Sequence, residues 1–231
     1  MDLEQIGPFA QFFDEKGLYL NLLNLWGPEE AVTTIRRAIE ESSNLEKEIQ
    51  ILLEDINWRP HLVAGVALLI IKSTDLSHLI WKTFDKGSWV NPQLAVVTYF
   101  HDPGFSKQAK ERLDKRCPIV FELSESMNRL EFHSATGGSG NDQVSYKSMA
   151  SLMALCQTIP SLAPYISELS ELDDVKKMLD DDWDQAGAIT KEWLWGITTC
   201  FNQLEIDLVR SENQQHFTQS FVNDLLGIDI E

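Results

Sequence analysis

Apolar residues recur at helical spacing along most of the chain. The clearest stripe occupies positions i, i+4, i+7, i+8 and i+11 and consists of Leu45, Ile49, Leu52, Leu53 and Ile56. This spacing places the apolar side chains on one face of an amphipathic helix. No segment of five or more residues alternates convincingly between apolar and polar positions, as a half-buried strand would. The pattern therefore predicts an all-α protein.

Two neighbouring segments, 51–70 and 80–100, share one order of features. Each contains a helix, a short turn that carries a tryptophan, a proline at the start of the next helix, and then an apolar helix. Trp58 corresponds to Trp89 at a period of 31 residues, and the prolines that follow them are 32 residues apart. A weaker copy surrounds Trp183. Because one hairpin cannot bury its inner face alone, the repeat predicts stacked antiparallel hairpins.

The period and the order of elements resemble HEAT and armadillo repeats, in which helical hairpins stack into an α-solenoid or α–α superhelix. The resemblance is clearest over 51–100 and concerns the class of repeat rather than one family. It implies a single helical-repeat domain over 1–231. We further expect a flexible, glycine-rich loop at 136–142 and a capping helix at about 214–226.

Acidic residues far outnumber basic ones. Lys and Arg total 19, Asp and Glu total 36, and the formal net charge of the 231 residues is −17. A surface this negative repels nucleic acids and anionic membranes, since both present phosphate groups, and it attracts basic protein surfaces. We therefore expect a basic protein partner, with no membrane and no nucleic acid. A plainer interpretation is that the acidity only keeps the protein in solution.

Cysteine usage and hydropathy predict a soluble, cytoplasmic protein. Cys117, Cys156 and Cys200 are an odd number at wide spacing without a CxxC pair, so neither a disulfide framework nor a zinc site is predicted. The N-terminus lacks the basic start of a signal peptide. The longest apolar run, 62–71, has ten residues and is too short to span a bilayer. No cofactor is indicated.

An acidic segment precedes the last long apolar helix, and its carboxylates are Asp180, Asp181, Asp182 and Asp184. The spacing matches the first ligands of an EF-hand loop. However, Gln185 stands where glycine is needed and Lys191 stands where a bidentate glutamate is needed, so calcium binding is not predicted. Two interpretations remain open. The carboxylates stabilise the start of the next helix, or they form a docking patch for a basic partner.

The sequence contains seven tryptophans, which is a high number. Tryptophans in the turns of stacked hairpins usually pack one repeat on the next. Trp89 follows a Gly-Ser pair and Trp183 follows a run of aspartates, so both are also candidates for partial exposure. An exposed tryptophan among acidic residues would suit a hot spot for a basic partner.

The pair His101-Asp102 ends an apolar helix and resembles the motif of HD-domain phosphohydrolases, which are all-helical metalloenzymes. The resemblance implies that the adjacent His and Asp bind a divalent metal that activates water for attack on phosphate. It also implies an upstream histidine, for which His61 or His78 is available, whereas no downstream aspartate stands out. In a simpler interpretation the pair belongs to the polar turn that ends this helix, where a histidine is favoured by the helix dipole.

Non-catalytic binding is the function that the sequence favours, since no Ser–His–Asp or Cys–His set can be assigned from spacing. A small, acidic HEAT-like protein resembles members of bacterial toxin–immunity systems, in which an acidic protein neutralises a cationic toxin domain, often a nuclease. The candidate binding residues are Asp180, Asp181, Asp182, Asp184, Trp89 and Trp183.

Two alternatives stay open. The first is a metal-dependent phosphohydrolase whose ligands include His61, His101 and Asp102. The second is a DNA-handling HEAT-like protein that uses the basic segment 107–116, which the net charge of −17 opposes.

Overall fold

The computed structural model describes residues 2–71, 74–117, 141–180 and 184–208, and all regular secondary structure within these ranges is helical. The prediction of an all-α protein is confirmed for this part of the chain. A 3₁₀ segment, η1 (Leu3–Phe13), comes first. The α-helices that follow are α1 (Tyr19–Asn24), α2 (Glu29–Glu41), α3 (Leu45–Glu54), α4 (Trp58–Ile70), α5 (Ser77–Lys86), α6 (Asn91–His101), α7 (Phe105–Asp114), α9 (Asn141–Cys156), α10 (Ala163–Ser170), α11 (Asp173–Asp180) and α12 (Asp184–Gln203).

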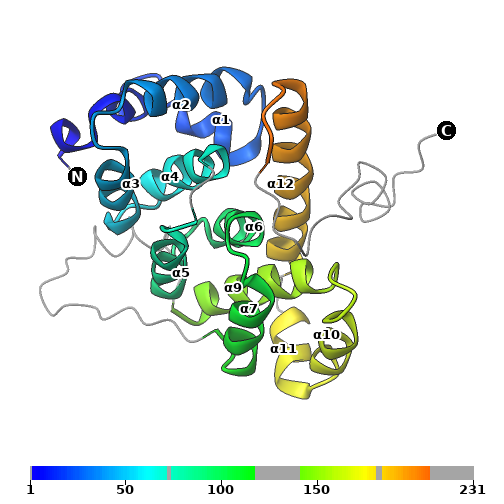
Figure 1. Ribbon diagram of the computed structural model, residues 1–231. Coiled ribbons are helices and arrows are strands. Elements are labelled where there is room, and N and C mark those ends of the chain that lie inside the picture. Colours follow the sequence, from blue (N-terminus) through cyan, green and yellow to red (C-terminus); the bar gives the residue numbers. More distant parts are fainter. Residues whose placement is uncertain (1, 72–73, 118–140, 181–183, 209–231) are drawn as a thin grey trace, which may run out of the picture.

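The repeated segments fold as two helical hairpins, α3–α4 and α5–α6. Their first helices are amphipathic, and their second helices are the near-continuous apolar runs of the sequence. Every residue of α6 is buried, and in α4 only Arg59 and Ile70 are not fully buried. The start of α4 is fixed by Asn57, whose side chain accepts a hydrogen bond from the Arg59 backbone at 3.0 Å. The apolar runs therefore form the centre of the fold (Figure 1).

The two hairpins lie directly against each other. The rings of Trp58 and Trp89, which correspond in the repeat, have centroids 4.8 Å apart. Gly65 lets α4 approach α6 closely, because a Cβ at this position would lie 3.0 Å from Val97 Cγ2. The Thr83 hydroxyl donates to the Leu53 carbonyl at 2.8 Å and so ties α5 to the end of α3. Corresponding positions of the repeat thus meet in space.

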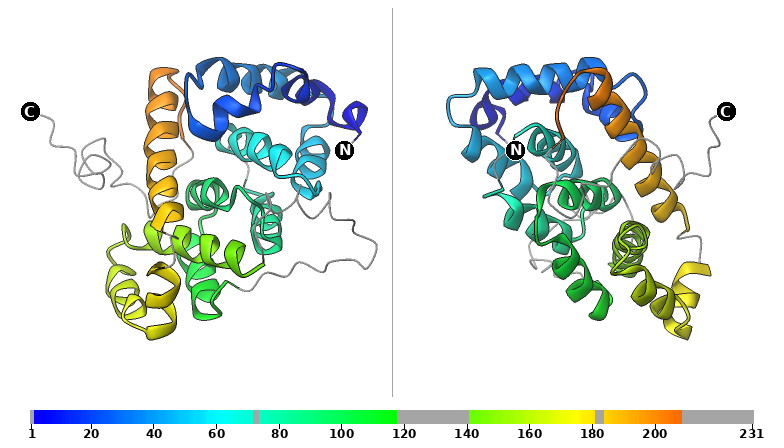
Figure 2. Two further views of the ribbon diagram at one scale, coloured as in Figure 1. Left: turned by 180° about the vertical axis from the view of Figure 1, so that it is seen from behind. Right: turned by 45° about the vertical axis from the view of Figure 1, so that its right-hand side comes forward.

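The second half of the chain covers α6 and then returns to the first half. α9 packs on α6 and α7, and α12 packs on α9 and α6. Figures 1 and 2 show α12 extending from the level of α9 to the level of α1 and α2. There the Trp193 indole donates to the Leu22 carbonyl at 2.8 Å, across 171 positions of sequence. In an open stack each repeat would contact only its neighbours, so α12 adds a long-range closure to the hairpin core.

The structure also tests some predicted boundaries. α9 begins at Asn141, so the last two residues of the loop predicted at 136–142 are helical. The remainder of that loop and the capping helix predicted at about 214–226 lie outside the described residues. No helix in the described ranges has the length and apolar character that crossing a membrane requires.

Candidate functional site

The predicted acidic patch lies at the junction of α11 and α12. Asp180 is the last residue of α11 and Asp184 is the first residue of α12, while Asp181, Asp182 and Trp183 lie outside the described residues. The next turn of α12, at Gln185 and Ala186, lines a cavity of about 420 Å³ that Trp89 also lines. The structure therefore brings Trp89 and the first turn of α12 to one place.

We call this cavity the tryptophan pocket. It is enclosed by the end of α1, the start of α6, α9 and the first half of α12. Its lining contains three indole rings in very different surroundings, since Trp193 is buried, Trp89 is half-buried and Trp26 is 81% exposed. The full lining is Leu23, Asn24, Leu25, Trp26, Trp89, Pro92, Gln93, Lys147, Gln185, Ala186, Ile189, Glu192 and Trp193.

The loop that carries Trp26 is held from two sides. α1 has only six residues, and its last carbonyls need partners from elsewhere. Trp193 of α12 donates to the Leu22 carbonyl at 2.8 Å, and Gln93 of α6 donates to the Leu23 carbonyl at 3.4 Å. These hydrogen bonds fix the end of α1 against the two helices that form the opposite wall of the pocket.

Leu25 continues this arrangement in a left-handed backbone conformation, with φ 51° and ψ 38°. A residue other than glycine adopts this conformation at some cost, and such strain persists only where surrounding contacts hold it. Here the contact is with α12 at Gly196, where a Cβ would lie only 2.6 Å from Leu25 Cδ1. Since a side chain at 196 would displace Leu25, the glycine is what lets the loop lie against the helix.

Two charged groups of opposite sign line the pocket. The Lys147 ammonium lies 5.4 Å from the centroid of the Trp89 ring, within reach of a cation–π interaction, and burial lowers its pKa below the ordinary lysine value. Glu192 is exposed, and within the described ranges its carboxylate makes no hydrogen bond or ion pair. The lining thus includes a half-buried ammonium beside the Trp89 ring and an exposed carboxylate on α12.

The histidine and aspartate candidates for a metal site occupy separate hydrogen-bond networks. His61 is buried between the two hairpins, where Nε2 lies 2.7 Å from the Asp55 carbonyl and Nδ1 lies 2.8 Å from Ser88 Oγ. A carbonyl only accepts, so Nε2 carries the proton and Nδ1 accepts from the serine hydroxyl. Burial lowers the pKa of His61 to about 4. Both ring nitrogens are engaged, which leaves this side chain no lone pair for a metal.

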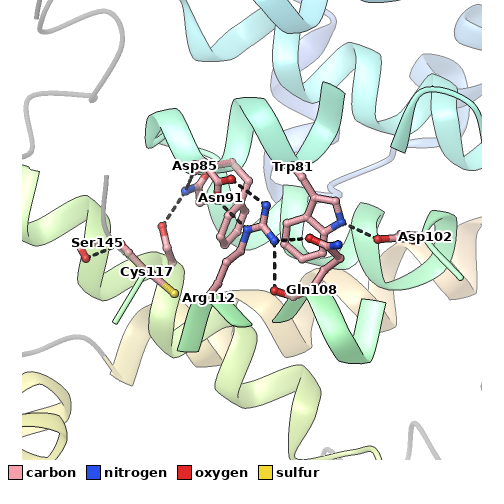
Figure 3. Close-up of polar contacts among 10 residues, drawn as sticks. Trp81, Asp85, Asn91, Asp102, Gln108, Arg112, Cys117 and Ser145 are labelled. Carbon is pink, nitrogen blue, oxygen red and sulfur yellow. Dashed lines mark hydrogen bonds and ion pairs between the residues drawn. The ribbon is translucent and has the colours of Figure 1, made fainter. Parts of the chain in front are cut away.

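His101 is the last residue of α6 and Asp102 follows it, but their side chains bond to different residues of α5. His101 is buried, with Nδ1 2.9 Å from Ser77 Oγ at the start of α5. Asp102 accepts from the Trp81 indole at 2.6 Å (Figure 3). It also accepts from the Gly104 backbone at 2.7 Å. The carboxylate therefore positions Trp81 and shapes the turn into α7, which agrees with the simpler interpretation of this segment.

The surroundings of Asp102 form a second, more open cavity of about 730 Å³ between α5 and α7. Arg112 lies in it with its guanidinium 4.0 Å from the centroid of the Trp81 ring, and it binds both oxygens of Asp85 at 2.7 Å (Figure 3). The lysines and arginine of the cavity are balanced by as many aspartates, namely Lys82, Lys86, Arg112, Asp75, Asp85 and Asp102. Asp85 and Arg112 join α5 to α7, and Asp102 joins the end of α6 to Trp81 of α5, so these charges hold the helices together.

Within the part of the chain that the structure describes, no group of three or more His, Cys, Asp or Glu side chains is arranged to hold a metal ion. The phosphohydrolase alternative therefore lacks the ligand set that its chemistry needs among these residues. Cys117, Cys156 and Cys200 are free and buried, and burial raises the pKa of each thiol, to about 12 for Cys117.

Comparison with known proteins gives no match, whether with family models, with curated proteins or with solved structures. The functional inference consequently rests on the geometry of the site.

Sequence reasoning missed the most exposed residue of the pocket, Trp26. A signal was present, because Trp26 precedes Gly27-Pro28, and such a pair marks a turn outside a helix. Lys147 and Glu192 had no such signal, since each lies in an ordinary amphipathic helical segment. Only the return of α12 to α1 shows that they belong to one site.

Proposed function

We propose that this protein is a non-catalytic binding module that docks a basic protein partner at the tryptophan pocket. The observation that carries the proposal is Trp26, a large aromatic side chain that is 81% exposed at the rim of an apolar cavity. Tryptophan is enriched among the residues that dominate binding energies. Glu192 lines the same cavity, and the net charge of −17 favours basic partners.

The proposed architecture is a HEAT-like stack of hairpins that α12 closes. The direct contact of Trp58 with Trp89 and the close approach of α4 to α6 at Gly65 support a repeating unit over 51–100. In this view the hairpins are the rigid support, and the pocket lies where α12 meets the support. Sites on rigid elements hold their binding groups in place before the partner arrives.

The biological role that fits best is that of an immunity-type protein, which neutralises a basic toxin or effector domain by covering it. Support for this role comes from the acidic charge and from the absence of a metal-binding group in the described residues. Such an interaction would associate fast at low salt and more slowly as salt screens the charges.

The test is an affinity capture from the native lysate at low and at high salt, with three baits: the unaltered protein, Trp26→Ala and Trp195→Ala. Trp195 lies on α12 and is 38% exposed, but it does not line the pocket, so it is a matched control. We expect one basic protein in stoichiometric amount with the unaltered protein and with Trp195→Ala, and a strongly reduced amount with Trp26→Ala. Equal recovery with all three baits, or recovery of nothing, would contradict the proposal.

A further inference from the structure

The charges and shape of the tryptophan pocket restrict what it can bind. Leu23, Pro92 and Ile189 add apolar surface to the lining, and the volume of about 420 Å³ falls in the range of roughly 300–1,000 Å³ that ligand pockets occupy. A flat acidic surface would attract any cation, whereas a lined cavity selects a side chain that fills it. Resting on the proposed function, we infer that the pocket takes one aromatic side chain of the partner, flanked directly by arginine or lysine residues.

The aromatic character of the anchor follows from the walls. Trp26 and Trp89 present ring surface to the cavity, and an aromatic side chain gains edge or offset contacts with such rings beyond simple burial. Trp193, which also lines the pocket, is held in place by its hydrogen bond to the Leu22 carbonyl. Trp26 is the most exposed of the large apolar side chains in the described residues. A partner ring in the pocket would cover this side chain and remove its apolar surface from water.

The flanking basic residues follow from the charges. Glu192 is an exposed carboxylate on the wall formed by α12, and in the described ranges no cation of this protein pairs with it. A basic partner residue beside the anchor would meet this carboxylate.

The position of Trp26 is set before binding. The left-handed conformation of Leu25 and its contact with Gly196 hold the loop against α12, and Gly27 adopts a positive φ of 58° directly after the tryptophan. An anchor pocket that is already formed loses less conformational freedom on binding. Gly196 is thus a positioning residue, because it acts on the pocket through Leu25.

The test uses three blocked pentapeptides as probes, titrated at low salt while the indole N–H signal of Trp26 is followed by nuclear magnetic resonance. The probes are Gly-Arg-Phe-Arg-Gly, Gly-Arg-Ala-Arg-Gly and Gly-Glu-Phe-Glu-Gly. We expect the first to bind about tenfold more tightly than either of the others, since it alone supplies both anchor and charge. Equal affinity for the alanine peptide would overturn the anchor, equal affinity for the glutamate peptide would overturn the flanking charge, and no binding at millimolar peptide would overturn the site.

Matched variants separate the parts of the inference. Trp26→Ala and Glu192→Lys should each weaken the first peptide about tenfold, while Trp195→Ala and Glu168→Lys, which change the same residue types outside the pocket, should leave it unchanged. Gly196→Ala should weaken the peptide and shift the Trp26 signal in the free protein, although it leaves every lining side chain in place. An unshifted Trp26 signal would contradict the positioning role.

Failure of this inference differs from failure of the proposed function. If the lysate partner is captured through Trp26 but no peptide is selected, the binding module stands and the anchor chemistry is wrong. If the peptides follow the expected order but no basic protein is captured, the site stands and the assigned function is wrong.

Discussion

The hairpin interface and the tryptophan pocket each contain a helix glycine that permits a close contact, but the contacts have different results. Between the hairpins, Gly65 lets α4 approach Val97 of α6, and at the closure Gly196 lets α12 approach Leu25. At the first contact a tryptophan ring pairs with another ring, and the neighbouring His61 and Thr83 side chains form their hydrogen bonds inside the protein. At the second, the adjacent tryptophan remains 81% exposed. Close backbone packing therefore accompanies a buried tryptophan, Trp58, in one place and an exposed tryptophan, Trp26, in the other.

The difference teaches where stability and function reside. At the hairpin interface the Trp58 ring and the His61 and Thr83 side chains contact other groups of this protein. Their substitution should therefore lower the stability of the fold. In the tryptophan pocket the Trp26 indole and the Glu192 carboxylate are exposed to solvent. Their substitution should therefore affect binding and have little effect on stability. Substitutions of the same type in the two regions test whether the first supports folding and the second supports binding.

The largest expected effect is that of Trp58→Ala. Trp58 is 8% exposed and contacts the rings of both Tyr19 and Trp89. Removing a buried tryptophan leaves a cavity, so the free energy of unfolding should fall by about 3–5 kcal/mol in urea denaturation. A loss as small as that expected below for Trp26 would show that the hairpin interface is not the stability centre.

The next effect is a pH dependence from His61. Burial lowers its pKa to about 4, whereas the unfolded chain takes up a proton near the ordinary value of 6.5. The unfolded state therefore binds more protons between these values, so the stabilising contribution is full above pH 6.5 and is lost as pH falls toward 4. The loss amounts to roughly 3 kcal/mol.

The measurement for this second prediction is the free energy of unfolding of the unaltered protein and of His61→Gln across that pH range. The variant should lose stability less steeply with falling pH. Identical slopes for the two proteins would exclude His61 as the source.

A smaller effect is expected from Thr83→Val at the hairpin interface. Its hydroxyl donates to the Leu53 carbonyl near the end of α3, and the substitution leaves that buried group without this donor. The cost should be about 1–2 kcal/mol by chemical denaturation. The matched control is Thr190→Val on α12, whose hydroxyl bonds only within its own helix to the Ala186 carbonyl. If the control costs as much, the contact between α5 and α3 adds nothing of its own.

The smallest effect on stability is expected from Trp26→Ala, within about 0.5 kcal/mol of the unaltered protein, because the side chain is mostly in water. A thermal or chemical melt checks this directly. Destabilisation comparable to that of Trp58→Ala would mean that Trp26 supports the fold rather than a partner.

Local pattern was enough to predict that the chain is helical, because helices follow from short-range periodicity. The contact of Trp58 with Trp89 agrees with the general expectation that tryptophans in the turns pack one repeat on the next. The buried character of α4 was likewise visible in its unbroken apolar run. The start of α9 at Asn141 could not be predicted, since the glycine-rich composition before it suggested that the loop continued to residue 142.

The candidate site was only partly predictable. Trp89 was identified as a candidate, but its place in one cavity with Trp26 depends on α12 returning across 171 positions to Leu22, which no local pattern encodes. His101 and Asp102 were adjacent in sequence and suggested a metal pair. In the fold they face Ser77 and Trp81, because each is taken up by a different helix contact.

The most direct test of the central claim is photo-crosslinking from inside the tryptophan pocket. A photoreactive phenylalanine analogue would replace Ile189, which lines the pocket and is 40% exposed, and in a control protein it would replace Leu172, which is 44% exposed between α10 and α11. After irradiation in the native lysate, we predict a crosslinked basic protein from position 189 and none from position 172. A crosslink from position 172 alone, or from both positions equally, would contradict the assignment of the tryptophan pocket as the binding site.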